Sequence, residues 1–215
     1  MKKITLLLAA FCLIASSAIA QPAQLAKGNI LLGVTSTMTV GGVWGSDFVG
    51  FGFSTHKVNN GTTTEPSYTT TSWNLLPKAG YFVMDNLVAG IELMAGGYMD
   101  KDVDGGDKNG ESIFGVGPFV RYYYPLDKVY PFAELEALFG SYKETWSSDI
   151  YKEGLVLIGG GVGVAVPLGD KVSFDALVGY SHASWKEKDV AEGDAYTYLG
   201  GGFGLRLGFT VYLPL

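Results

Sequence analysis

From about Gly28 onward, apolar and polar residues alternate with a period of two, which is typical of β-strands whose two faces meet different surroundings. In the last such segment, Leu205, Leu207 and Phe209 share one face and Arg206 lies on the other. No segment sustains the three- or four-residue spacing of an amphipathic helix. The pattern predicts seven strands after residue 71, over residues 72–84, 87–100, 112–124, 130–143, 155–166, 172–185 and 199–213.

Short and long connections alternate between these segments. Tight turns rich in Pro, Gly, Asp and Asn lie at 84–86, 125–129 and 167–171, and longer polar stretches lie at 100–111, 145–150 and 186–194. A tilted strand of about 9 to 11 residues crosses a bilayer. Short turns at one end and long loops at the other are typical of outer-membrane barrels. We therefore predict an all-β fold, an antiparallel transmembrane β-barrel, in preference to a soluble β-sandwich.

The strand count depends on the N-terminal region. Bacterial single-chain barrels have an even number of strands, so the seven segments need one more, but residues 28–40 and 47–57 are both candidates. We expect eight strands. Either residues 28–40 form the first strand and 43–67 a long outer loop, or one bent first strand runs through both segments with a bulge at Gly41 and Gly42. Ten strands is the alternative.

The first twenty residues have the composition of a secretory signal peptide. Two lysines precede an apolar run over residues 4–14, and an Ala-Ile-Ala site ends at Ala20. We predict a signal peptide over residues 1–20 and a barrel domain over residues 21–215. The only cysteine, Cys12, lies within this signal. The mature chain would have no thiol, which excludes disulfides, cysteine-based metal sites and thiol catalysis.

Composition supports a membrane barrel. Charged residues make up 17% of the chain, against about 25% in soluble domains, and aromatic residues make up 13%. The formal net charge of -6 argues against nucleic acid as a partner. Aromatic residues near the predicted strand ends suggest belts at the two membrane interfaces. These are Trp44, Trp73, Trp146, Trp185 and Tyr122, Tyr123 and Tyr124.

Several segments resemble the small outer-membrane β-barrel proteins of the OmpA/OmpX-like, porin-like superfamily. They are "KGNILLG", "LLPKAGYFVMDNLVAG", "FGVGPFVRYYYP", "PFAELEALFG" and "LIGGGVGVAVPLGDKVSFDALVGY", which together extend over nearly all of the mature chain. The resemblance implies a monomer in the bacterial cell outer membrane. Its partners would be outer-membrane lipids and, during biogenesis, the barrel-assembly machinery.

The resemblance is specific for architecture and not for function, since such barrels include adhesins, structural anchors, small-solute channels and a few lipid-modifying enzymes. We expect a non-enzymatic protein with a structural or surface-interaction role through its extracellular loops, which would bind an extracellular ligand of unknown nature. A narrow ion or small-solute channel is the first alternative. A barrel enzyme acting on lipid A is the second.

Counting by two places seven charged residues on the strand faces opposite the apolar ones. They are Lys78, Glu92, Arg121, Glu134, Glu136, Asp175 and Arg206. In a barrel these faces line the lumen, which in an eight-stranded barrel is just wide enough for side chains to fill. Charges there must pair with one another or with water. We expect a structural ion-pair network; the alternative is a narrow path for ions or water.

One pair of residues permits an enzyme hypothesis. His182 and Ser184 lie two apart on one predicted strand and therefore on the same face. They resemble the His-x-Ser pair of lipid A deacylases, in which the His is the base for a Ser nucleophile and a downstream Glu orients it. Glu187 and Glu192 follow. We favour the alternative, a polar rim at the membrane interface, and expect no catalytic site.

A second motif suggests a metal. The stretch "DKDVDGGDKNGE" fits the calcium-loop pattern, with oxygen ligands from Asp100, Asp102, Asp104, the Gly106 carbonyl and Glu111. The predicted flanking strands exclude an EF-hand, which needs flanking helices. The hypothesis is a Ca²⁺ site of millimolar affinity at best on an outer hairpin, and the alternative is a solvated acidic loop. No other cofactor is expected.

Overall fold

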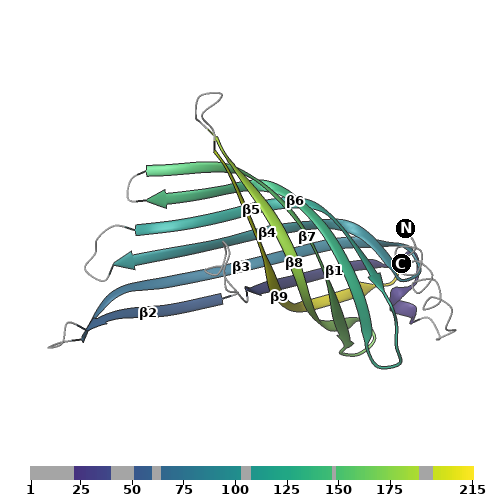
Figure 1. Cartoon of the computed structure of the whole chain (residues 1–215). Helices are drawn as coiled ribbons and strands as arrows, with labels where there is room; N and C mark the ends of the chain where they lie inside the picture. The colour runs from purple at the N-terminus through teal and green to yellow at the C-terminus, as the bar shows by residue number, and fades with distance from the viewer. Residues whose placement is uncertain (1–21, 40–50, 60–63, 103–107, 147–148, 189–195) are drawn as a thin grey trace, which may run out of the picture.

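The computed structural model describes residues 22–39, 51–59, 64–102, 108–146, 149–188 and 196–215. The predicted signal peptide lies outside them. A 3₁₀ turn, η1 (Ala23–Leu25), precedes nine strand segments of one antiparallel sheet (Figure 1). They are β1 (Ile30–Thr39), β2 (Phe51–Asn59), β3 (Thr64–Met84), β4 (Leu87–Asp102), β5 (Lys108–Tyr123), β6 (Tyr130–Trp146), β7 (Asp149–Pro167), β8 (Val172–Glu187) and β9 (Thr197–Leu213). No helix in these ranges is long and apolar enough to cross a membrane.

The sheet closes on itself through β1. One edge of β1 pairs with β9 and the other with residues 76–81 of β3. Strand β2 pairs with the other half of β3, residues 64–73. Because β1 and β2 lie along different halves of β3, they occupy one strand position between them. The closed barrel therefore has eight strand positions. The eight-strand prediction is confirmed, and the ten-strand alternative is wrong.

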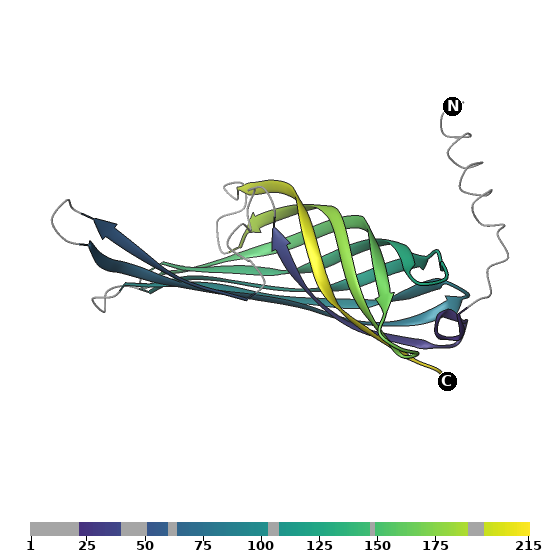
Figure 2. The same cartoon turned by 90° about the horizontal axis from the view of Figure 1, so that it is seen from below.

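The structure also corrects the N-terminal arrangement. Residues 51–59 and 64–67 are strand, so a long outer loop over 43–67 is wrong. The proposed bulge at Gly41 and Gly42 lies outside the described residues. In both views, β2 to β6 run on past the closed part of the barrel (Figures 1 and 2). The strands are therefore longer than predicted at the loop end, where Thr69, Thr70 and Thr71 provide no alternation of polar and apolar residues.

Two different faces explain the period of two. Large apolar side chains point outward and are exposed, among them Leu135 at 69%, Val162 at 68% and Ile158 at 62%. Charged side chains such as Arg121 and Glu92 point inward and are buried. A closed sheet leaves no unpaired backbone edge to lipid, and an apolar exterior with a polar interior is the arrangement of a membrane-spanning barrel. The predicted fold class is confirmed.

An apolar plug fills the lumen at the end where the short turns lie. Its buried members are Leu25, Leu31, Phe82, Val88, Phe119, Tyr123, Tyr130, Phe132, Ala165, Leu177 and Tyr212. The η1 turn seals this end: Leu25 is fully buried, and its carbonyl accepts a 2.9 Å hydrogen bond from the backbone N–H of Asn86. Asn86 has a φ of 66°, a conformation that asparagine tolerates in tight turns.

A second apolar cluster lies in the lumen toward the loop end. It consists of Leu76, Met94, Leu138, Tyr142, Leu155, Leu157, Ala183 and Trp185, with Ile113 packed against it. The sequence predicts an outer aromatic belt position for Trp185 and also for Tyr123, which belongs to the plug. Both side chains instead face inward, with exposures of 8% and 0%. Trp73, which is 41% exposed, does lie on the outer surface.

Candidate functional site

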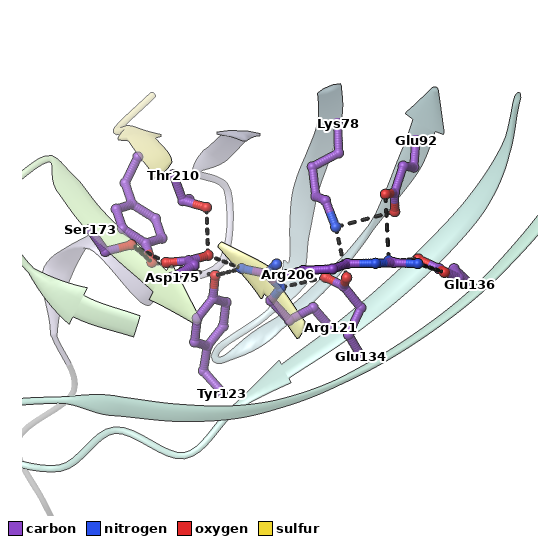
Figure 3. A network of polar contacts seen from close by, with 11 residues as sticks. Lys78, Glu92, Arg121, Tyr123, Glu134, Glu136, Ser173, Asp175, Arg206 and Thr210 are labelled. Atoms are coloured by element: carbon purple, nitrogen blue, oxygen red, sulfur yellow. Dashed lines mark hydrogen bonds and ion pairs between the residues drawn. The ribbon is translucent and has the colours of Figure 1, made fainter. Parts of the chain in front are cut away.

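Figure 3 shows the charged belt, defined as Lys78, Glu92, Arg121, Glu134, Glu136, Asp175 and Arg206. It lies between the two apolar clusters, because Arg121 contacts Tyr123 and Phe132 of the plug and Arg206 lines a cavity with members of the second cluster. The members of the belt come from six strands, β3, β4, β5, β6, β8 and β9. All have side chains that are 2% exposed or less, except Arg206 at 12%. The structure thus brings together all seven charged residues that alternation places on inner faces.

Sheet register sets two of the contacts. Lys78 lies directly opposite Glu92 on neighbouring strands, and Arg121 lies directly opposite Glu134. Facing side chains of opposite charge on one side of a sheet attract each other. The Lys78 Nζ lies 3.1 Å from Glu92 Oε2, and Arg121 Nε donates a 2.6 Å hydrogen bond to Glu134 Oε2.

Other contacts cross the lumen. Lys78 Nζ donates a 2.7 Å hydrogen bond to Glu134 Oε1, so that carboxylate binds two cations. Arg121 Nη1 donates to Asp175 Oδ2 at 2.5 Å. The Lys78–Glu134 and Arg121–Asp175 contacts join strands that are not neighbours in the sheet, which fixes the cross-section of the barrel at this level. On the neighbouring strand, the guanidinium carbon of Arg121 lies 4.0 Å from the ring centre of Phe132.

Arg206 makes a second group of ion pairs in the belt. Both of its terminal nitrogens donate to the carboxylate of Glu136, and Nη1 lies 3.8 Å from Glu92 Oε1. A Cβ on Gly159 would lie 2.8 Å from Glu136 Oε1, so glycine leaves the space that this pair needs. Glu92 is fully buried, and within the described residues its oxygens have ion-pair partners but no hydrogen bond.

Four hydroxyl groups complete the belt and were missed in the sequence. Ser173 and Thr210 donate hydrogen bonds to the two oxygens of Asp175 at 2.7 and 2.8 Å. Tyr123 OH accepts one from Arg121 at 2.9 Å, and Tyr212 OH lies 3.0 Å from Ser173 Oγ. Counting by two along each strand places all four residues on the same inner faces as the charged residues. The same count could therefore have identified them from the sequence.

The belt contains four acids and three bases, so its formal charge is -1. Moving charges out of water is costly unless they are paired and hydrogen-bonded. The contacts above meet that requirement for six of the seven groups, and Glu92 has ion-pair partners alone. Oxygens of Glu92, Glu134 and Glu136 lie within 4.8 Å of one another, but Lys78, Arg121 and Arg206 already bind these carboxylates. The ion pairs join side chains from six strands of the barrel.

His182 and Ser184 lie elsewhere, on the outward face of β8. His182 is exposed and Ser184 is half-buried, and Val178 and Tyr180 of the same face are 55% and 46% exposed. Within the described residues no hydrogen bond joins the two side chains. Tyr196 N–H and Tyr198 OH donate to Glu187 at 3.1 Å each, and Glu192 lies outside the described residues. Among the residues that the structure describes, no base, nucleophile and orienting acid come together here.

The calcium hypothesis concerns a loop that is described only at its ends. Asp100 accepts hydrogen bonds from Thr70 and Tyr98, both at 2.6 Å, and Glu111 is half-buried. Asp102 ends β4, while Asp104 and Gly106 lie outside the described residues. The Ca²⁺ site stays a prediction. Calorimetric titration of the folded protein with Ca²⁺, against Asp102→Ala, tests it, because an equal absence of heat would leave only a solvated loop.

No protein-family model and no curated protein matches this chain. Among solved structures, the N-terminal β-barrel domain of OprF from Pseudomonas aeruginosa is similar, with 9% identity over 87% of this chain and 98% of that one, at a TM-score of 0.41. OprG from P. aeruginosa has 14% identity over 89% and 99%, at 0.46, and Neisserial surface protein A has 12% over 86% and 97%, at 0.46. The closed sheet and its apolar exterior carry the fold assignment: this chain is an eight-stranded antiparallel β-barrel with the outward-facing apolar surface of a membrane-spanning barrel.

Proposed function

We propose that this protein is a non-enzymatic barrel with a structural or surface-interaction role, exerted through the part of the sheet outside the membrane. The observation that carries this is strand length. Strand β3 has 21 residues and β7 has 19, whereas about 9 to 11 cross a bilayer. At about 3.3 Å per residue and a tilt of about 40°, β3 rises roughly 50 Å, against roughly 30 Å of hydrocarbon. Because the other end has only short turns, the excess lies at the loop end.

The filled lumen favours a role exerted outside the barrel and argues against a channel. The charged belt lies across the lumen, and the apolar plug with Leu25 lies on its turn side. A passing ion would have to separate pairs such as Arg121 and Asp175 and then cross an aromatic layer. We expect no steady single-channel conductance from the purified protein in planar bilayers. Steady conductance would favour the narrow-channel alternative.

Site-directed crosslinking in whole cells tests where partners bind. Because the mature chain is predicted to contain no thiol, one introduced cysteine directs the reaction to one place. Lys101→Cys puts it on the projecting end of β4, and Lys128→Cys puts it in the 125–129 turn, with both positions exposed. A thiol-reactive crosslinker should give adducts with surface components from Lys101→Cys alone. Adducts only from Lys128→Cys would contradict a role of the projecting sheet.

A further inference from the structure

A cavity of about 140 Å³ lies inside the barrel on the loop side of the charged belt. Its walls come from β3, β4, β5, β7, β8 and β9, through side chains that include Leu76, Met94, Ile113, Leu157 and Trp185. Leu76, Met94, Leu157 and Trp185 are each no more than 9% exposed. The cavity is thus a chamber of the lumen, lined largely by inward-facing side chains.

The floor of the chamber is polar. Arg206, Ser181, Asn74 and Thr37 line it, and Arg206 is already bound by Glu136. Asn74 Oδ1 accepts a 2.7 Å hydrogen bond from the Thr37 N–H, and Asn74 Nδ2 donates to the Thr37 carbonyl at 3.1 Å. Within the described residues, the Ser181 hydroxyl makes no hydrogen bond. The chamber therefore offers the Ser181 hydroxyl, beside that of Thr37, at the base of an apolar space.

We propose that this chamber binds a neutral monocyclic aromatic molecule, with space for one hydroxyl group beside Ser181. The volume matches this class, because an apolar cavity of about 150 Å³ takes up benzene. Water needs two to four polar partners, which the floor offers but the Leu, Met and Trp walls do not. A molecule of six to eight carbons therefore fits the chamber better than water does.

The walls favour an aromatic ring over an alkyl chain. The indole of Trp185 can pack edge-to-face or offset-stacked with a ring, and the thioether of Met94 makes favourable contacts with ring edges. The Arg206 guanidinium at the floor adds attraction to a ring face. An alkyl chain would gain only the apolar contacts.

The charges near the floor exclude ionised ligands. A cation would face Arg206, the charged group that lines the chamber. An anion would need Arg206 as its partner, but both terminal nitrogens of Arg206 are bound to Glu136, and the belt below has one more acid than base. Burying an ion without a partner is costly. Toluene and phenol fit this description, and benzoate does not.

Methionine methyl signals provide the test, because the chain carries its own controls. Met94 lies in the chamber wall, whereas Met84 and Met99 are 54% and 52% exposed on the outer face. The refolded mature protein, labelled with ¹³C at methionine methyls, is titrated with toluene in detergent micelles. We expect a saturable shift of the Met94 signal in the millimolar range. Toluene dissolved in the micelle acts on Met84 and Met99 without saturation.

Variants separate the chamber from the micelle. Ala183→Phe and the smaller change Ala183→Leu fill the chamber and should weaken binding at least tenfold, whereas Ile158→Phe on the outer face should leave it unchanged. Phenol should bind about two- to tenfold more tightly than toluene, and Ser181→Ala should abolish that difference, since a net hydrogen bond has this effect. Benzoate should give no saturable shift.

Three results would overturn the proposal. The first is a Met94 shift that follows those of Met84 and Met99 without saturating. The second is unchanged toluene binding in a folded Ala183→Phe or Ala183→Leu variant. The third is a larger saturable Met94 shift with heptane than with toluene, which would identify an alkyl chain as the occupant. The wild-type titration decides the question even where a filled variant does not fold.

Discussion

Removing the positive charge of Arg121 should be among the most destabilising single changes in the barrel. Arg121 is 1% exposed and binds Glu134, Asp175 and Tyr123 at 2.6, 2.5 and 2.9 Å. Arg121→Met keeps much of the side-chain volume but removes every one of these donors. The charge of the belt changes from -1 to -2, and the freed carboxylates stay buried.

The expected loss follows from the contacts that remain. Glu134 keeps Lys78, and Asp175 keeps the hydroxyls of Ser173 and Thr210 but no cation. Breaking a buried ion pair by removing one partner typically costs about 3 to 5 kcal/mol, because the other charge is left without compensation. We therefore expect Arg121→Met to lower the free energy of unfolding by about 3 to 5 kcal/mol.

Reversible urea unfolding in lipid vesicles, monitored by tryptophan fluorescence, measures this. The double variant Arg121→Met, Asp175→Asn restores the belt charge to -1 and should recover part of the loss, so the double-mutant cycle yields the coupling between the two residues. Lys128→Met removes an exposed charge from the 125–129 turn and should change stability by no more than about 0.5 kcal/mol. A loss below about 1 kcal/mol for Arg121→Met would refute a paired, water-excluded belt.

Three further changes test other parts of the molecule. Leu25→Ala opens the apolar plug and should cost about 2 to 4 kcal/mol in the same unfolding assay. Burial and the facing carboxylate of Glu187, then that of Glu144, raise the pKa of Glu153 at the loop end. Glu153→Gln should therefore stabilise by about 0.2 to 1 kcal/mol at pH 7, and the gain should vanish as pH falls below about 4.3, where Glu153 is protonated in both folded and unfolded chains. Ser184→Ala should leave the lipid A acyl pattern of expressing cells unchanged by mass spectrometry; an altered pattern would restore the enzyme hypothesis.

The period of two predicts the barrel and the inner faces because successive side chains of any strand point to opposite faces of the sheet. It places Arg121 and Glu134 inside without knowledge of their partners. The error at Trp185 shows how strict this parity is. Since His182 and Ser184 face outward, the adjacent Trp185 must face inward, yet its position near a strand end suggested an interfacial belt.

Contacts across the lumen could not be predicted in the same way. The pairing of Arg121 with Asp175 depends on register between several strands and on the curvature of the closed sheet, and neither is encoded in local alternation. The outer strand ends were missed for a different reason. Residues such as Thr69 to Thr71 are polar on both faces where the sheet leaves the membrane, so their backbone pairing leaves no hydropathy signal.

The seam between β1 and β9 affects how the barrel can form. Ten register pairs join these strands, from Ile30 with Leu213 to Thr39 with Gly204, so the last closing contacts join the two ends of the folded chain. Apart from β1 with β3, neighbouring strands elsewhere pair through hairpins, which are local contacts and form early. Closure has to wait until β9 has been synthesised and exported. A chain that lacks β9 would lose only the β8–β9 hairpin and retain the others, yet it would present two open edges, the state in which a β-sheet is most prone to aggregate.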